Sequence, residues 1–490
     1  MKLDELLEGI EIHAVTADIN VSVSSITSDS RQVATNGIFV AIKGIQTDGN
    51  NFVDQAIRRG AIAIVSERPS RQEIPWIQVA SDRSALALLA SNFYGKPSSR
   101  MKLVGITGTN GKTTTTHLVE SILLSAGHEV ALMGTIDCHG PGFEYVAELT
   151  TPEAPDLERL LKSAVDAGCS YGVMEVSSHA IALKRVERLD FDVVTFTNLS
   201  GDHLDFHGTM RAYFEAKKKL FSGLVGPAPK YAVLNRDDET FEELRTCGIP
   251  EVISYGMENS ADVHPLNFQL HWQGIDAEFQ TPRGKLSIRS RLIGRPNLYN
   301  LSAAIAIGNV LDMSDEAIVS GIDRLHSVPG RFEFVDCGQA FRVIVDYAHS
   351  DDALKQLLEA AREITDGRLL VVFGCGGERD HTKRLRMGEV AGNLSDFAVV
   401  TSDNPRAEDP MKVINMVEVG LLKVTGRWVS HVDREDAIRV AIDMAKEGDT
   451  VVLAGKGHES YQWIAQERIP FDDRVVARKL LNELNTRKGS

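Results

Sequence analysis

The sequence predicts an α/β fold with about three domains. Its 490 residues correspond to three domains at roughly 150 residues each. Short apolar runs alternate with helical segments along most of the chain, which is typical of βαβ units with a mainly parallel sheet. Two stretches rich in glycine, proline and serine, residues 95–99 and 327–331, interrupt this pattern and are typical of linkers. We therefore expect domains at residues 1–98, 99–327 and 328–490.

The first domain is predicted to be a small α/β unit. Apolar runs of the β type at residues 37–42 and 61–65 are separated by turn residues. A helix is predicted over residues 82–94, because the pattern stops at Gly95 and a polar, proline-containing segment follows.

The central domain is predicted to begin with a strand, a glycine-rich loop and a helix. The strand is expected at residues 101–106, and the helix ends at Gly127. Further strands are predicted at residues 171–176, 192–197 and 231–234, and helices at residues 157–167 and 300–311. This order indicates one α/β domain with a mainly parallel sheet.

In the last domain the alternation starts again. Strands are predicted at residues 342–346, 369–373, 397–401 and 450–454, and helices at residues 352–364, 411–422 and 434–445. This is the pattern of an open, doubly wound, Rossmann-like sheet, in which ligands bind at the carboxyl ends of the strands.

Composition and charge exclude several classes of protein. The net charge is −15, which disfavours nucleic-acid binding through a general basic field. The five cysteines are scattered without a CxxC pair, so neither a disulfide framework nor a zinc site is indicated. No run approaches the roughly 18 apolar residues of a membrane span, and the acidic, leucine-rich start lacks an export signal. We expect a cytoplasmic protein without nucleic-acid partners or membrane insertion.

The loop from Gly105 to Thr114 predicts a polyphosphate site. It lies between a predicted strand and a predicted helix, where backbone N–H groups and the helix dipole bind phosphate oxygens. Lys112 can reach the β- and γ-phosphates, and Thr113 can ligate Mg²⁺. The glycine spacing is a variant of the usual pattern, because Ile106 stands where that pattern has glycine. ATP binding is favoured over a chance glycine turn.

The ends of the neighbouring strands supply candidate metal ligands. Glu175 follows one strand and can hold Mg²⁺ at the phosphates, or else cap the next helix. Residues 198–208, which include His203, are dense in Asp and His. Zinc is possible in principle, but the missing cysteine pair and the nearby phosphate loop favour magnesium. These features alone do not separate kinase, ATPase, GTPase and ligase.

Four segments together resemble the Mur ligase family over essentially the whole chain. They are GITGTNGKTT at 105–114, MEVSSH at 174–179, NLSGDHLD at 198–205 and VDYAH at 345–349. The resemblance implies an N-terminal domain for a UDP moiety, a central ATPase domain, and a C-terminal domain that brings the incoming amino acid and closes over ATP. It is strongest to the members that add diaminopimelate to a UDP-muramoyl dipeptide in peptidoglycan precursor synthesis.

The resemblance also implies roles for residues at the ATP site. Catalytic roles fall on Lys112, Glu175, His203 and Lys217. Two Mg²⁺ ions would be held by Thr113, Glu175, His203 and a carbamylated Lys217; the alternative for Lys217 is a solvated lysine run. ATP contacts fall on Gly108, Thr109, Asn110, Gly111, Lys112, Thr113, Thr114, Asn297, Asn300, Arg331 and Asp346.

The tetrapeptide Asp403, Asn404, Pro405, Arg406 indicates which amino acid is added. Diaminopimelate carries a distal carboxylate that lysine lacks, and an arginine fork binds a carboxylate through two parallel hydrogen bonds. Family members that add diaminopimelate carry this motif, although Asp-Asn-Pro is also a common turn. The resemblance adds Arg379, Gly455 and Glu459 to the amino-acid site.

The nucleotide-sugar substrate has its own set of residues by resemblance. Contacts to the UDP-muramoyl dipeptide fall on Ser30, Ile45, Gln46, Thr47, Thr150, Thr151, Ser177 and Arg185. Leu149 and Leu183 replace residues that are polar in other members, which puts those two contacts in doubt.

The hypothesis is ATP-dependent amide formation by a monomer. The D-glutamyl γ-carboxylate attacks the γ-phosphate to give an acyl phosphate and ADP, and the amine of diaminopimelate then displaces phosphate. Two alternatives remain open. A ligase like folylpolyglutamate synthase would lack the DNPR tetrapeptide and the UDP domain, and a nucleotide-switched binding protein would hydrolyse ATP without ligation.

Overall fold

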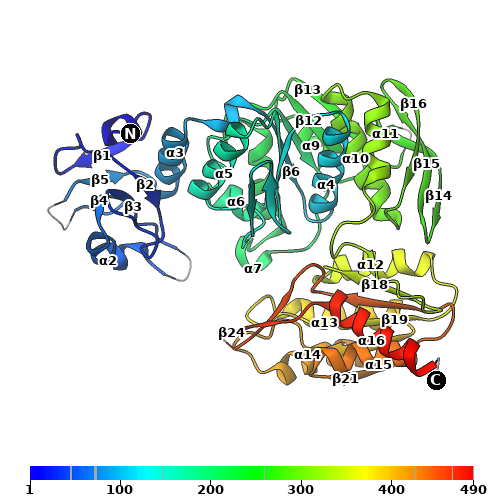
Figure 1. The fold of residues 1–490 in the computed structure, drawn as a ribbon. Coiled ribbons are helices and arrows are strands. Elements are labelled where there is room, and N and C mark those ends of the chain that lie inside the picture. The colour runs from blue at the N-terminus through cyan, green and yellow to red at the C-terminus, as the bar shows by residue number, and fades with distance from the viewer. Residues whose placement is uncertain are drawn as a thin grey trace.

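The structure is a computed structural model of residues 1–490. It describes all residues except 45–46, 71–73, 147, 259, 425, 466 and 489–490. The proposed contacts of Ile45 and Gln46 therefore lie outside the described residues. The chain forms three lobes, each built on its own main sheet: one at the left of Figure 1, one at the top and one below it.

The N-terminal lobe is a five-stranded sheet with short helices. The strand order is β1 (Ile12–Val15), β5 (Trp76–Val79), β4 (Ala61–Ser66), β3 (Gly37–Val40) and β2 (Ser25–Thr27). The other elements are α1 (Leu3–Leu6), the 3₁₀ turn η1 (Gly49–Phe52), α2 (Val53–Arg58) and α3 (Asp82–Tyr94). Helix α3 has the predicted bounds, because Ser81 caps its first turn and Gly95 ends it at φ 74°.

The central lobe is an eight-stranded sheet. Its order is β13 (Glu251–Tyr255), β12 (Tyr231–Asn235), β11 (Val193–Phe196), β6 (Lys102–Thr107), β10 (Tyr171–Glu175), β7 (Val130–Met133), β8 (Cys138–Gly140) and β9 (Phe143–Tyr145). The pairs from β13 to β7 are parallel, as predicted, and β8 and β9 are antiparallel. One face of this sheet packs against α4 (Lys112–Ser125), α10 (Arg295–Val310) and α11 (Asp315–Arg324), and the other against α5 (Ala154–Asp166) and several shorter helices.

Shorter elements complete the central lobe. They are the 3₁₀ turns η2 (Pro97–Arg100) and η3 (Lys219–Phe221) and the helices α6 (Ser178–Ala182), α7 (Leu204–His207), α8 (Met210–Lys218) and α9 (Phe241–Arg245). A separate antiparallel sheet of β14 (His264–His271), β15 (Gly274–Thr281) and β16 (Gly284–Ser290) lies against α10 and α11. The sequence analysis did not predict this sheet.

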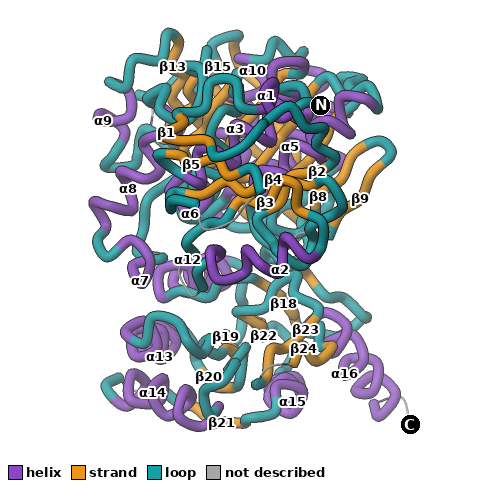
Figure 2. Tube along the Cα trace, turned by 90° about the vertical axis from the view of Figure 1, so that its left-hand side faces the viewer, coloured by secondary structure: helices purple, strands orange, loops and turns teal. Residues whose placement is uncertain are grey.

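The C-terminal lobe has the predicted doubly wound fold. The strand order is β17 (Glu333–Phe334), β18 (Arg342–Asp346), β22 (Thr450–Ala454), β19 (Leu369–Phe373), β20 (Phe397–Thr401) and β21 (Trp428–His431), and only the pair of β17 with β18 is antiparallel. Helices α12 (Asp351–Glu363), α13 (Thr382–Leu394) and α14 (Pro410–Leu422) cover one face, and α15 (Arg434–Met444) and α16 (Asp473–Lys488) the other. Figure 2 shows these layers in its lower half.

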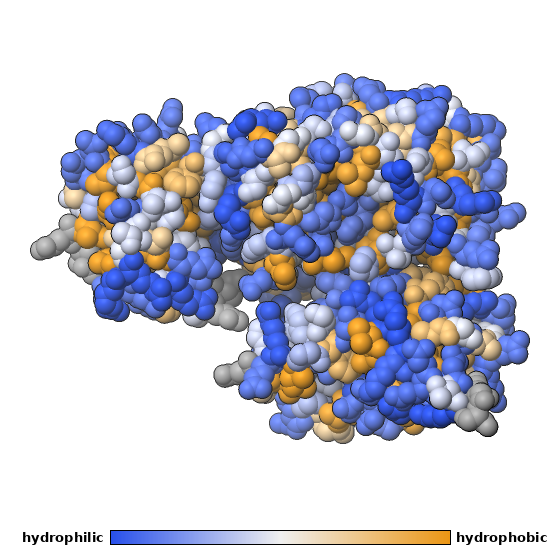
Figure 3. Space-filling model, in the orientation of Figure 1, coloured by the Kyte–Doolittle hydropathy of each residue, from blue (hydrophilic) through white to orange (hydrophobic). Residues whose placement is uncertain are grey.

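A hairpin of β23 (Tyr461–Ile464) and β24 (Glu467–Pro470) projects from this lobe (Figure 1). The space-filling view shows an open notch between the N-terminal and C-terminal lobes (Figure 3). None of the described helices is long and apolar enough to cross a membrane. The domain boundaries at 98/99 and 327/328 stay a prediction.

Candidate active site

The phosphate loop connects β6 to α4 and requires glycine at two positions. Gly108 has φ 149°, and a Cβ there would lie 1.8 Å from Oγ1 of Thr197. Gly111 has φ 86°, and its Cβ would lie 2.5 Å from Oδ1 of Asn300. Helix α4 begins directly after the loop, so its first N–H groups and its dipole face the same space. This is the geometry of a polyphosphate site.

The side chain of Lys112 folds back over the phosphate loop. Its Nζ donates to the carbonyl oxygens of Gly108, at 2.9 Å, and Thr109, at 2.8 Å. Burial lowers the pKa of Lys112, and the carboxylate of Glu175 partly opposes this. The ammonium therefore stands where phosphate oxygens would replace carbonyl oxygens as its partners.

Glu175 is held at the carboxyl end of β10 by two threonines. Its Oε2 accepts hydrogen bonds from Oγ1 of Thr113, at 3.1 Å, and Oγ1 of Thr135, at 3.0 Å. Its Oε1 accepts a bond from the backbone N of Thr135, at 2.8 Å. The predicted pair of Thr113 and Glu175 is therefore brought together. The sequence analysis did not single out Thr135, although its position just after β7 carries the same strand-end signal.

Lys217 is buried beside the phosphate loop, with an exposed fraction of 1%. Its Nζ donates to the carbonyl oxygen of Gly108 at 2.7 Å and lies 4.6 Å from the ring centre of Tyr213. Burial and the nearby Lys112 hold the pKa of Lys217 well below its usual value. The alternative that Lys217 belongs to a solvated lysine run is therefore wrong, because α8 turns this lysine inward.

His203 lies in a group of polar rings next to the loop. Its ring centre is 4.7 Å from that of His179, and its Nε2 is 3.5 Å from Oδ2 of Asp202. Burial lowers the pKa of His203, and the neutral imidazole is the form that ligates metals. His349, from the C-terminal lobe, approaches the same Asp202 at 3.9 Å.

The donor set can be compared with the needs of Mg²⁺. Among the described residues, no three His, Cys, Asp or Glu side chains gather closely enough to form a metal site by themselves. The carboxylate of Glu175 and the hydroxyl of Thr113 are oxygen donors beside the phosphate loop. Mg²⁺ is commonly bound through one or two carboxylates together with substrate phosphates, so this part of the set fits the ion.

Several side chains join the central and C-terminal lobes across the site. Nη2 of Arg331 donates to Oγ1 of Thr113 at 3.0 Å. Nδ2 of Asn110 lies 3.5 Å from Oδ2 of Asp352. Asp346 is half-buried, and desolvation raises its pKa; its two oxygens accept the backbone N–H groups of Phe332 and Ala348 at 2.8 Å each. The carboxyl ends of the two sheets thus face each other.

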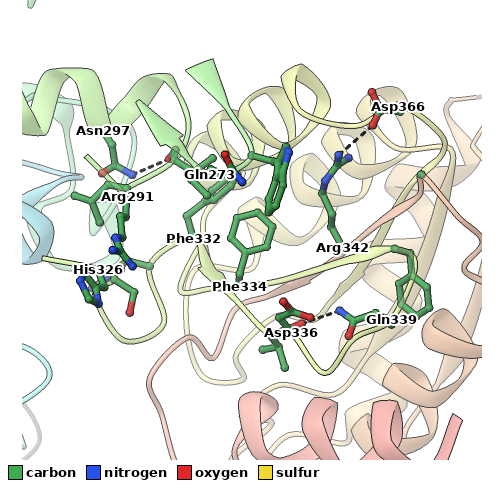
Figure 4. Close-up of a pocket in the computed structure, with 18 of the residues that line it drawn as sticks. Gln273, Arg291, Asn297, His326, Phe332, Phe334, Asp336, Gln339, Arg342 and Asp366 are labelled. Carbon is green, nitrogen blue, oxygen red and sulfur yellow. Dashed lines mark hydrogen bonds and ion pairs between the residues drawn. The ribbon is translucent and has the colours of Figure 1, made fainter. Parts of the chain in front are cut away.

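A cavity of about 680 Å³ lies between these lobes. Figure 4 shows Phe334 near its middle, with Asn297, Arg291 and His326 on one side and Arg342 on the other. Asn297 and Asn300 are hydrogen-bonded to each other, and Asn297 also donates to the carbonyl oxygen of Ile293 at 2.8 Å. Arg331 lines the cavity and also contacts Thr113. Arg331 and Asn297 therefore link the cavity to the phosphate loop, and its aromatic walls suit a planar ring.

The tetrapeptide from Asp403 to Arg406 follows β20. Arg406 has φ 52°, and its backbone pairs with the β23–β24 hairpin, donating to the carbonyl oxygen of Trp463 at 2.9 Å and accepting from the N of Ala465 at 2.7 Å. Its Nη1 donates to the carbonyl oxygen of Gly377 at 2.5 Å. Burial and the nearby Arg379 lower the pKa of Arg406.

The other predicted amino-acid contacts gather at the same place. Nδ2 of Asn404 donates to Oε2 of Glu459 at 2.9 Å. Gly455 has φ 115°, and a Cβ there would lie 3.5 Å from Oδ2 of Asp403. Arg379 stands within 3.9 Å of Oδ2 of Asp205 in the central lobe. The carbonyl oxygen of Pro405 packs closely against Gly377, where a Cβ would lie only 1.9 Å from it.

The residues assigned to the nucleotide sugar and its peptide form two groups. One group adjoins Glu175. The hydroxyl oxygens of Thr135 and Thr150 lie 3.1 Å apart. Oγ1 of Thr151 donates to the carbonyl oxygen of Glu175 at 2.9 Å and accepts from the N of Ser177 at 3.1 Å, and Arg185 pairs with Glu153 at 2.8 Å. The other group lies in the N-terminal lobe. There Oγ of Ser30 donates to Oε1 of Gln55 at 2.8 Å, and Thr47 is exposed.

Comparison with known proteins adds to this geometry. Three sequence profiles match: the Mur ligase family, catalytic domain at residues 22–94; the Mur ligase middle domain at 106–308; and the Mur ligase, glutamate ligase domain at 330–457. The chain is also 46% identical over 485 residues to the UDP-N-acetylmuramoyl-L-alanyl-D-glutamate–2,6-diaminopimelate ligase of Solibacter usitatus, covering 98% of each chain. The chain belongs to the Mur ligase family.

Solved structures of Mur ligases have the same three-lobed architecture. A UDP-N-acetylmuramoyl-L-alanyl-D-glutamate–2,6-diaminopimelate ligase superposes with a TM-score of 0.69 at 30% identity, covering 99% of both chains. The Mycobacterium tuberculosis folylpolyglutamate synthase complexed with ADP superposes with a TM-score of 0.62 at 19% identity, covering 76% of this chain and 91% of that chain. This second likeness concerns the fold alone.

Proposed function

We propose that this Mur ligase joins meso-2,6-diaminopimelate to UDP-N-acetylmuramoyl-L-alanyl-D-glutamate with hydrolysis of ATP, in peptidoglycan precursor synthesis. The main structural support is that the phosphate loop and the tetrapeptide from Asp403 to Arg406 face each other across the two lobes. Arg379, beside Arg406, reaches within 3.9 Å of Asp205 in the lobe that holds the phosphate loop. An amine bound near Arg406 can therefore meet an acyl group that is activated beside Lys112.

ATP is proposed to extend from the cavity to the phosphate loop. The base would occupy the aromatic cavity near Asn297 and Phe334, and the phosphates would lie on the loop at Lys112. Thr113, Glu175, His203 and Lys217 are the proposed ligands of two Mg²⁺ ions, which supply positive charge against the phosphates when bound. Glu175 and Thr113 support this assignment because they already stand together at 3.1 Å.

Lys217 would take part as a carbamate. An ammonium cannot ligate a cation, whereas the carbamate formed when a neutral amine adds CO₂ and loses a proton is an anion with two oxygen donors. Burial and the proximity of Lys112 favour the neutral amine that this addition requires. Because Lys217 is buried, the carbamate would also be protected from water.

The reaction would proceed through an acyl phosphate. The D-glutamyl γ-carboxylate, placed near Thr150, Thr151 and Ser177, attacks the γ-phosphorus, and ADP leaves. The amine of diaminopimelate then attacks the acyl carbon, loses a proton and expels phosphate. The protein contributes positioning and charge, because a carboxylate and a triphosphate repel each other unless cations such as Lys112 and Arg331 stand between them. The contact of Arg331 with Thr113 fits a closed arrangement that excludes water.

We propose a monomer as the active unit. The five cysteines are free in the part of the chain that the structure describes, which fits a reducing cytoplasm. We therefore propose a cytoplasmic enzyme whose substrates are small molecules: ATP, the UDP-muramoyl dipeptide and diaminopimelate.

Phosphate release tests the proposal. We expect release from ATP only when the UDP-muramoyl dipeptide and diaminopimelate are both present, with one phosphate per new amide bond. Mass spectrometry of the nucleotide product should show the tripeptide. Equal release with either substrate missing would contradict the ligase and favour the ATP-hydrolysing binding protein. Release that requires a folate substrate and glutamate would instead favour the folylpolyglutamate-synthase alternative.

Trp272 offers a direct test of the base site. It lines the cavity at the turn between β14 and β15. We expect ADP to change the tryptophan fluorescence of the wild-type protein, and expect Trp272→Phe to remove most of this change while ADP still binds by calorimetry. Trp428→Phe, on the outer strand β21, is the matched control and should keep the signal. A signal that survives in Trp272→Phe would place the base elsewhere.

A further inference from the structure

Lys456 is a buried cation in the amino-acid site to which no role has yet been assigned. It lies in the loop after β22 and has an exposed fraction of 0%. Its Nζ donates to Oε2 of Glu459 at 2.9 Å and to Oδ1 of Asn404 at 3.2 Å, and stands 3.6 Å from Oδ1 of Asp403. One ammonium thus contacts three side chains of the predicted diaminopimelate site. A lysine is rarely buried this deeply unless it is paired.

Lys456, Asn404 and Glu459 form a closed ring of hydrogen bonds that holds Oε2 of Glu459 in place. Asn404 donates through Nδ2 to Oε2 of Glu459, the same oxygen that Lys456 contacts. The Oδ1 of Asn404 accepts from Lys456 and from the backbone N of Trp463, at 2.9 Å. Both bonds to Glu459 therefore fall on Oε2 and leave Oε1 outside the ring. The rotation of the Glu459 side chain is restricted from two sides.

The loop that carries Lys456 is anchored by a buried arginine. Nη2 of Arg434 donates to the carbonyl oxygen of Ala454 at 3.0 Å, and the Arg434 guanidinium forms a fully buried pair with Asp473. The backbone just before Gly455 is therefore anchored to α16. This anchoring holds the backbone from which the Lys456 side chain extends, so that the ammonium group stays between Asp403 and Glu459.

We propose that Lys456 is a positioning residue for the added amino acid. It holds Glu459 and Asn404 so that the free Oε1 of Glu459 faces an ammonium group of the substrate, while Lys456 itself touches no substrate atom. Without this cation, the carboxylates of Asp403 and Glu459 would repel each other across a gap with little water. The inference rests on the proposed function, because it assumes that the amino acid bound here is diaminopimelate.

Lys456→Met tests this role in the full chain. We expect the KM for diaminopimelate to rise at least about tenfold, while the KM values for ATP and the UDP-muramoyl dipeptide stay close to wild type. Lys456→Arg keeps the charge and should give a smaller rise. If Lys456→Met does not fold, Lys456→Gln keeps a hydrogen-bond donor in a smaller side chain and carries the same expectation.

Arg368→Met is the matched structural control. Arg368 pairs with the buried Asp449 at 2.6 Å at the opposite end of β22, so its loss should lower the melting temperature without a selective change in any KM. A folded Lys456 variant that keeps the wild-type KM for diaminopimelate would overturn the proposal. So would a variant in which all three KM values rise together. If the wild-type protein itself released no phosphate with diaminopimelate, the proposed function would fail as well, which separates the two outcomes.

Discussion

Replacing Lys112 with alanine is expected to lower kcat for phosphate release by about 10²- to 10³-fold, the typical effect of removing one preorganised charge-stabilising donor. Its Nζ lies within 2.9 Å of two carbonyl oxygens of the phosphate loop, so it stands where charge gathers as the γ-phosphoryl group is transferred. The loop itself should keep its shape, because Gly108 and Gly111 define it through their backbone. Steady-state phosphate release at saturating substrates would measure the effect.

Lys102→Ala is the control for this experiment. Lys102 begins the same strand β6 at the opposite end from the phosphate loop, and its Nζ donates to the hydroxyl oxygen of Tyr171 at 3.4 Å. We expect wild-type activity in this variant. Melting curves should confirm that both proteins are folded. An Lys112→Ala enzyme that keeps nearly full activity would exclude the phosphate loop as the site of phosphoryl transfer.

The elements that the sequence predicted well share one physical property. Strands β19, β20 and β22 were predicted with their observed bounds at residues 369–373, 397–401 and 450–454. They lie inside a parallel sheet with helices on both faces, so each is a continuous apolar run ended by turn residues. The strand-end motifs followed from the same rule, because carboxyl ends of parallel strands meet at one edge.

The three-stranded sheet of β14, β15 and β16 was missed for the opposite reason. Much of β14 is exposed, including Phe268, whereas β15 buries alternate residues. Mixed exposure of this kind gives no continuous apolar run, and the period of two is broken by a register shift near Pro265. The sheet nevertheless forms part of the proposed base site, because its β14–β15 turn carries Trp272 and Gln273 into the wall of the cavity.

The sequence also could not show which motifs touch. Gly111 must be glycine because Asn300 packs against it from almost 190 residues further along the chain, and Arg331 reaches Thr113 from the last lobe. Without the resemblance to the Mur ligases, the residues around Lys217 read as a solvated lysine run, and its burial shows only once α8 is in place. Thr135 and Lys456 were overlooked for a related reason. Each acts through another side chain, Glu175 or Glu459, and such a role appears only when the partner is placed beside it.

The net charge of −15 takes on a different meaning once the site is assembled. Read as an average, an acidic chain disfavours anionic ligands. Four cations lie where the lobes meet: Lys112 and Arg331 at the phosphate loop, and Arg379 and Arg406 at the proposed amino-acid site. Local fields in poorly solvated clefts outweigh the distant surface charge, because salt screens interactions beyond about 10 Å.

Replacing Arg406 with lysine is expected to change which amino acid the enzyme prefers. Nη1 of Arg406 is already bonded to the carbonyl oxygen of Gly377, and its backbone is held by the β23–β24 hairpin. The rest of the guanidinium can therefore present two parallel N–H groups to the distal carboxylate of diaminopimelate. Lysine offers a single point charge and cannot reproduce this geometry. We expect kcat/KM for diaminopimelate to fall by about 30-fold, equivalent to about 2 kcal/mol.

The comparison with L-lysine as substrate makes the experiment specific. L-lysine has no distal carboxylate, so its already poor kcat/KM should hardly change in Arg406→Lys, and the preference for diaminopimelate should shrink by the same factor. Arg427→Lys, an exposed arginine before β21, is the control and should keep both values. If both amino acids lost activity equally in Arg406→Lys, the arginine would support the fold of the site. If neither lost activity, the carboxylate would have to be recognised elsewhere, with Arg379 as the remaining guanidinium beside it.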